Sequence, residues 1–71
     1  MKREPVRSSV LRAAGYDPST AMLEIEFMSG DVYRYFAIPP SLHRALLEAE
    51  SPGAFFNQNI SDKYPTRQQY D

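Results

Sequence analysis

The sequence predicts an α+β domain, in which a three-stranded antiparallel β-meander is followed by two short α-helices packed on one face of the sheet. Two periodicities and the boundary between them carry this prediction. Before the pair Pro39-Pro40 the apolar residues recur with a period of two, and after it with a period of 3.6. Proline cannot extend a strand ladder but can open a helix, so the pair marks the change from sheet to helix. A three-stranded sheet cannot hide its own apolar face, so the helices must cover it.

The chain has 71 residues, no cysteine and one histidine. This length predicts one domain over residues 1–71, with residues 1–5 and 66–71 flexible. A chain so short buries only about 60 % of its unfolded surface, so its core must be dense in large side chains. Without cysteine and with a single histidine, neither a thiolate site nor a His-rich metal site is expected, and no cofactor is expected.

The first strand is expected over residues 6–16. Two small residues and Gly15 interrupt its alternation, which predicts a bulge or a bend. Residues 17–20 are predicted to turn, because Asp17 and Ser19 can hydrogen-bond nearby backbone and Pro18 presets φ.

The second and third strands, residues 22–27 and 32–36, are predicted to form a hairpin. Gly30 suits the left-handed position of a three-residue loop. That loop keeps the apolar residues of both strands on one face, whereas a two-residue loop would mix the faces. The resulting register sets Phe27 opposite Asp31, Ile25 opposite Tyr33, Leu23 opposite Tyr35 and Glu24 opposite Arg34.

The first helix is predicted over residues 41–50, with its apolar side formed by Leu42, Ala45, Leu46 and Ala49. Ser51-Pro52 predicts the start of a second helix. Gly53 in its first turn weakens that helix by up to ~1 kcal/mol relative to alanine, and close approach to the first helix is the expected compensation. The apolar side of the second helix is formed by Phe55, Phe56, Asn59 and Ile60.

The trio Tyr33-Arg34-Tyr35 has two interpretations. As a stacking platform, exposed aromatic rings would contact bases while Arg34 contacts phosphate. The register favours the other interpretation, in which both tyrosines are core residues and Arg34 pairs with Glu24 on the opposite face. Phe55 and Phe56 are expected to pack on the sheet. Asn57, a mediocre helix former, has a structural role or contacts a ligand.

No pattern in the sequence indicates an enzyme. His43 lies on the predicted polar side of the first helix with no nucleophile or second base in the pattern. Glu24 and Glu26 share one face of a strand, and the solvated side of an amphipathic strand accounts for them. No phosphate loop, zinc spacing or nucleophile elbow occurs.

Charge is divided unevenly along the chain, although the net charge is only −1. Residues 1–12 form a basic arm, and residues 13–31 carry only acidic groups. The net charge argues against a strongly basic nucleic-acid binder. The charged start is not followed by an apolar run, and no apolar stretch approaches ~20 residues, so neither a signal peptide nor a membrane span is expected. With no cysteine, a cytoplasmic location is favoured.

The ordered set of motifs resembles the KTSC domain family. The resemblance covers residues 6–64, and a central Tyr-x-Tyr is the hallmark of the family. The residues that carry it are Val6-Arg7-Ser8-Ser9, Gly15-Tyr16-Asp17, residues 23–27, Tyr33-Arg34-Tyr35, Pro39, residues 51–57, Ile60 and Tyr64. As site residues the resemblance singles out Ser9, Tyr16, Tyr33, Tyr35, Phe55, Phe56, Asn57 and Tyr64. The family occurs at the C-terminus of some lysyl-tRNA synthetases and as small, mostly bacterial proteins.

The resemblance implies a small binding module, with RNA, in particular tRNA, as one partner. The basic residues available for RNA are Lys2, Arg3, Arg7, Arg12 and Arg34. The alternative is a protein-interaction module, because a three-stranded meander has two open edges to which a partner could add a strand. Pairing of two copies by this route would give a weak homodimer in place of a monomer.

Overall fold

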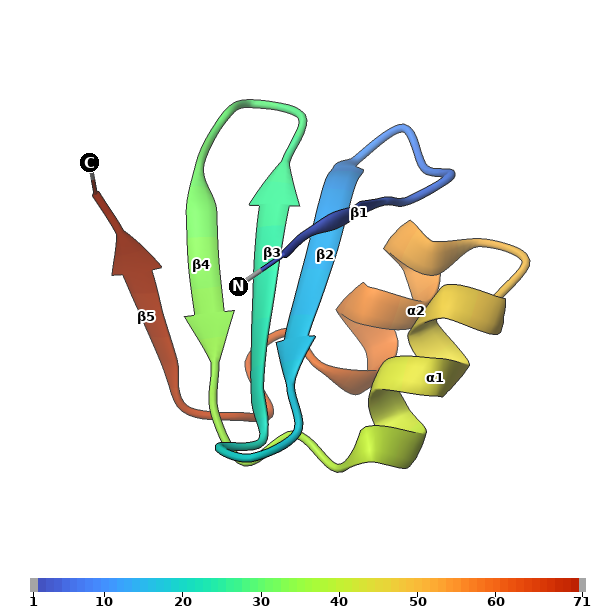
Figure 1. Cartoon of the computed structure of the whole chain (residues 1–71). Coiled ribbons are helices and arrows are strands. Elements are labelled where there is room, and N and C mark those ends of the chain that lie inside the picture. Colours follow the sequence, from blue (N-terminus) through green and yellow to red (C-terminus); the bar gives the residue numbers. More distant parts are fainter. Residues whose placement is uncertain (1, 71) are drawn as a thin grey trace.

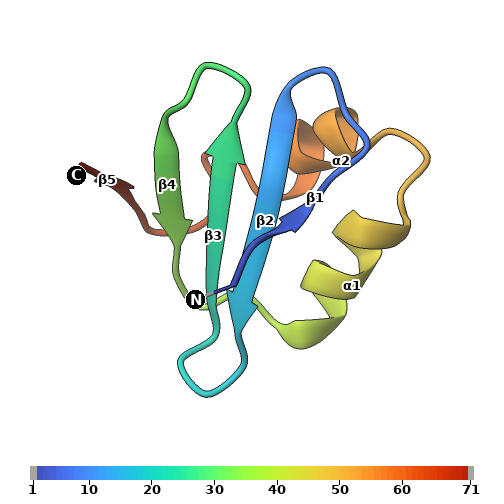
Figure 2. The same ribbon diagram turned by 45° about the horizontal axis from the view of Figure 1, so that its top comes forward.

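The computed structural model describes residues 2–70, which form one five-stranded antiparallel sheet and two helices (Figure 1). Across the sheet lie β1 (Glu4–Pro5), β2 (Leu11–Asp17), β3 (Met22–Phe27), β4 (Val32–Tyr35) and β5 (Thr66–Gln69), in that order. The helices α1 (Pro40–Glu48) and α2 (Pro52–Asn59) lie on one face, toward the β2 side (Figures 1 and 2). The α+β class is confirmed, but the described residues form five strands where three were predicted.

The two additional strands come from segments that the sequence assigns to flexible ends. β1 pairs with β2, and β5 pairs with β4, so the edges expected to be open are covered. Neither segment alternates apolar with polar residues, and periodicity therefore gives no signal for them. Their pairing satisfies backbone groups along the outer edges of β2 and β4. Met1 and Asp71, also assigned to the flexible ends, lie outside the described residues.

The central hairpin has the predicted register. Leu23 lies opposite Tyr35, Glu24 opposite Arg34, and Ile25 opposite Tyr33. The loop closes as expected, because Gly30 adopts a φ of 98° and its N–H donates to the Phe27 carbonyl at 2.9 Å. Apolar side chains of both strands therefore face the helices.

β2 begins at Leu11, five residues later than predicted. The reason is Ser8, whose Oγ accepts the backbone N–H groups of Val10 at 3.0 Å and Leu11 at 3.1 Å and so holds residues 8–11 in a turn. The irregularity expected in this strand is a bulge between Leu11 and Ala13. The turn at residues 17–20 is confirmed, since Asp17 Oδ1 accepts the Ser19 N–H at 3.0 Å.

Both helices start at a proline, and α1 ends at Glu48, two residues before the predicted end. Gly53 does make a close contact, but with a different segment from the one expected. A Cβ at Gly53 would meet Ser8 Oγ at 3.2 Å, so α2 packs here on the turn before β2 and not on α1.

The core lies between the sheet and the helices. Six side chains with no exposed surface form its centre. They come from β2, β3, the link after β4, α1 and the residue that follows α2: Leu11, Leu23, Ile25, Ile38, Leu46 and Ile60. Within residues 2–70, neither helix is long and apolar enough to cross a membrane.

Candidate binding surfaces

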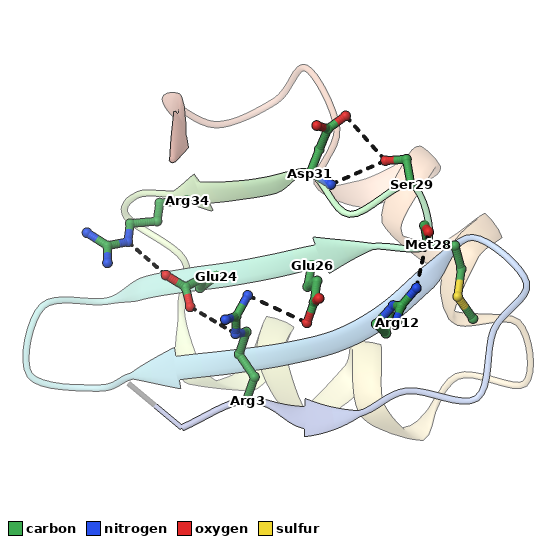
Figure 3. Close-up of polar contacts among 8 residues, drawn as sticks. All are labelled: Arg3, Arg12, Glu24, Glu26, Met28, Ser29, Asp31 and Arg34. Carbon is green, nitrogen blue, oxygen red and sulfur yellow. Dashed lines mark hydrogen bonds and ion pairs between the residues drawn. The ribbon is translucent and has the colours of Figure 1, made fainter. Parts of the chain in front are cut away.

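An ion-pair network lies on the face of the sheet away from the helices, which we call the open face (Figure 3). Its centre is Glu24, which is only 6 % exposed. Arg34 Nε lies 2.9 Å from Glu24 Oε1, and Arg3 Nε lies 3.3 Å from Glu24 Oε2. A buried carboxylate requires such partners. The expectation that Glu24 lies on a solvated face is therefore wrong, because two arginine side chains cover it.

Arg3 reaches Glu24 by crossing β2 (Figure 3). The residues of β2 that lie opposite Glu26 and Glu24 are Ala13 and Gly15, and both are buried. Their small size leaves room for the Arg3 side chain, whose Nη1 also lies 3.6 Å from Glu26 Oε1. The small residues that interrupt the apolar–polar alternation of this strand thus have a structural role. They let a basic side chain from one edge reach the middle of the sheet.

Two further arginines border this network. Arg12, at the bulge, donates from its guanidinium to the Met28 carbonyl at 3.3 Å (Figure 3). Arg67 on β5 lies directly opposite Arg34 and is exposed. Sequence reasoning missed Arg67, because none of the residues of β5 is apolar and the segment was assigned to a flexible end.

The basic residues predicted to contact RNA do not form one cluster. The structure brings Arg3 and Arg34 together around Glu24, with Arg12 near one end of the same strands. Arg7 is exposed beside Glu50, at the connection between the two helices. Lys2 is exposed and belongs to none of the ion pairs found among residues 2–70.

A second surface is a groove of about 550 Å³ on the helix side of the sheet, which we call the groove. It lies between the β3–β4 loop, the turn before β2 and α2. Five of the eight residues singled out by the resemblance line it: Ser9, Tyr33, Tyr35, Phe56 and Asn57. Ser9 and Asn57 are exposed, so their presence there is not explained by core packing.

Aromatic side chains form the floor of the groove. Phe27 contacts Tyr33 and Phe56 edge to face, with ring centroids 5.6 and 5.5 Å apart, and Phe56 contacts Tyr35 in the same way at 5.3 Å. Tyr35 is 5 % exposed, and burial raises the pKa of its hydroxyl to about 12, with the negative charges of Tyr33 and Asp62 adding to the effect. Both tyrosines face the helices, so they are not a stacking platform on the open face.

The remaining residues singled out by the resemblance support the fold. Tyr16 donates its hydroxyl to the Ile38 carbonyl at 2.6 Å, and its ring stacks on His43 with centroids 4.6 Å apart. Phe55 and Tyr64 are half-buried against the core. His43 is therefore half-covered rather than fully solvated, and burial lowers its pKa.

Comparison with known proteins identifies the family. The sequence model of the KTSC domain matches residues 7–64, which is most of the chain. The chain belongs to the KTSC family. The crystal structure of a KTSC domain protein from Yersinia pestis superposes with a TM-score of 0.94, is 38 % identical and covers 97 % of both chains.

Two relatives show the contexts in which similar KTSC domains occur. An uncharacterized protein of Stutzerimonas stutzeri (strain A1501) is 57 % identical over 58 residues, which are 82 % of each chain. A lysine–tRNA ligase of Nostoc punctiforme is 43 % identical over 60 residues, which are 84 % of this chain but only 11 % of the ligase. The KTSC domain is thus found both as nearly the whole of a small protein and as a minor part of a large one.

Proposed function

We propose that this KTSC domain is a non-catalytic accessory module that binds RNA, in particular tRNA. The observation that carries the proposal is the gathering of Arg3, Arg12, Arg34 and Arg67 along one sheet. The similarity of this chain to a segment of a lysine–tRNA ligase of Nostoc punctiforme supports the choice of tRNA. Because tRNA is used in the cytoplasm of bacteria, we propose that location as well.

The pair Arg34 and Arg67 supports a phosphate contact. Like charges directly opposite each other on neighbouring strands repel. The Nε of Arg34 donates a hydrogen bond to the Glu24 carboxylate. The Nη groups of Arg34 donate no hydrogen bond within residues 2–70. The Arg67 guanidinium takes part in none of the ion pairs of the described residues, so it and these Nη groups can take a phosphate, for which the arginine fork is well suited. An anion between them would relieve the repulsion.

The proposal excludes a catalytic role for the chain. A nucleophile needs a base within hydrogen-bond reach, held in place by a third group. The one histidine stacks on Tyr16. Within residues 2–70, no three acidic or histidine side chains gather as a metal site would require.

An NMR titration of the labelled domain with whole tRNA, first at low and then at physiological salt, tests the proposal. Amide shifts are expected at Arg34, Arg67 and their strand neighbours, and they should weaken as salt rises. Arg67→Gln should weaken binding severalfold, whereas Arg44→Gln on α1, an exposed arginine on the helix side, serves as the charge-matched control. Shifts that are absent at low salt, or equal losses in the two variants, would overturn the proposal.

A protein partner at a sheet edge is the second candidate. In the described residues the outer edge of β5 has no partner strand, so its backbone groups can pair with an extended peptide or with a second copy. Light scattering at high concentration tests the second-copy form: a monomer at all concentrations would remove it.

A further inference from the structure

The groove on the helix side has a charge opposite to that of the open face. Asp31 lines it, and no lysine or arginine is among its lining residues in the described chain. Asp62 lies close enough to influence the ionisation of Tyr35 on the groove floor. Asp31 is exposed and accepts a hydrogen bond from Ser29 Oγ at 3.2 Å, but it takes part in none of the ion pairs of residues 2–70, so its negative charge is not paired there. A phosphate would be repelled here, and a cation would be attracted.

The walls of the groove suit a side chain with an apolar stem. Val10 and Met28 border it and are each 46 % exposed, so their side chains can contact a ligand in the groove. The floor offers the ring of Tyr33. Exposed Asn57 and Ser9 add polar groups at the rim.

The aromatic floor is held in place by its own packing. Tyr33 contacts Phe27, which contacts Phe56, which in turn contacts Tyr35. These edge-to-face contacts fix the rings before any ligand arrives, so little ordering of the floor is needed on binding. A ring face fixed in this way beside a carboxylate favours a cation by both cation–π and ionic attraction.

We propose that the groove binds a lysine or arginine side chain from a basic segment of a protein partner. The stem of that side chain would lie along Val10 and Met28, with the cation between Asp31 and the Tyr33 ring. This site is separate from the proposed phosphate contact at Arg34 and Arg67, because these arginines lie on the open face and the groove lies on the helix side. The domain would then connect an RNA on one side with a basic protein segment on the other.

The test uses two capped pentapeptides, Ala-Lys-Ala-Lys-Ala and the same peptide with both lysines acetylated on the side chain. In an NMR titration the lysine peptide is expected to shift the amides of Val10, Asp31 and Asn57, and the acetylated peptide is not. Asp31→Asn should weaken binding about three- to fivefold, the size expected for one partly exposed ion pair. Asparagine can still accept the hydrogen bond that Ser29 Oγ donates to Asp31, so the hairpin loop is preserved.

Glu48→Gln is the matched control, since Glu48 is an exposed acidic residue on α1. Its binding of the lysine peptide should equal that of the unchanged protein. Equal weakening in Glu48→Gln and Asp31→Asn would show general charge attraction and overturn the proposal. Equal binding of the acetylated peptide, the absence of any shift at millimolar peptide, or shifts of the same groove amides by tRNA would overturn it as well. None of these outcomes depends on Arg67, so this test and the RNA test can fail independently.

Discussion

Tyr35 and Glu24 belong to neighbouring strands, yet they lie in opposite environments. Tyr35 faces the helices and packs against Phe56 in an apolar core, whereas Glu24 faces away and is covered by Arg3 and Arg34. Both are nearly inaccessible, at 5 % and 6 % exposure. The comparison shows that burial in this small domain comes from two sources: hydrophobic packing on one face, and long basic side chains laid over a carboxylate on the other.

The largest expected effect is on the helix-covered face. Tyr35→Ala should lower the free energy of unfolding by roughly 3 kcal/mol or more, because it removes a buried ring and leaves a cavity. Urea denaturation followed by circular dichroism measures this change. A loss below ~1 kcal/mol would mean that the ring contributes little to the core, and the contrast between the two faces would fail.

The second prediction concerns the ionisation of the same ring. Its raised folded pKa, about 12 against an ordinary 10.0, means that the neutral hydroxyl is favoured in the folded state. The resulting stabilisation is fully present below pH 10 and is lost as the pH rises from 10 through 12, by at most about 3 kcal/mol.

Tyr35→Phe isolates this contribution, since the variant cannot ionise at that position. Between pH 10 and 12 the unchanged protein should lose stability more steeply than the variant in parallel urea titrations. Identical slopes would show that Tyr35 titrates as it does in the unfolded chain.

On the open face a smaller effect is expected. Glu24→Gln should cost about 1–2 kcal/mol, because the charged hydrogen bond from Arg34 and the ion pair with Arg3 are weakened while both arginines can turn to water. The same variant should bind tRNA more tightly, since it removes negative charge beside the proposed phosphate contact. Thermal unfolding and the tRNA titration give the two readouts, and weaker tRNA binding by a folded variant would contradict the proposed RNA surface.

The smallest effect on stability is expected at Arg67. Arg67→Gln should change the free energy of unfolding by less than about 0.5 kcal/mol, because an exposed arginine opposite Arg34 gains little from its position. Urea denaturation of this variant beside Arg44→Gln measures the difference. A clear loss of stability would show that Arg67 supports the fold. The role of Arg67 in binding would then have to be tested with a different substitution.

The sequence predicts the central hairpin in detail and the sheet edges poorly. Alternation and Gly30 determine the register, because a shift by one residue would bring apolar side chains to the open face. The edge strands contain no such alternation, so nothing in residues 4–5 or 66–69 distinguishes a paired segment from a loose one. The contact of Gly53 with Ser8 was also beyond prediction, since it joins segments far apart in the chain.

The candidate surfaces were predicted only in part. The pairing of Glu24 with Arg34 follows from the register, but the approach of Arg3 depends on β1, which has no signal in the sequence. The groove could not be predicted, because it lies where three separate segments meet. The resemblance to the family named five of its residues without indicating that they lie together.

The short outer strands have a consequence for how the domain behaves at high concentration. β1 has two residues, one of which is Pro5 with no N–H to donate, and β5 consists of Thr-Arg-Gln-Gln. Such short, polar edges are weaker templates for strand addition than β4 would be, and β5 covers the more apolar β4. A chain cut after residue 65 would present β4 as a bare edge, with Val32 and two tyrosines, and we expect it to aggregate where the longer chain does not.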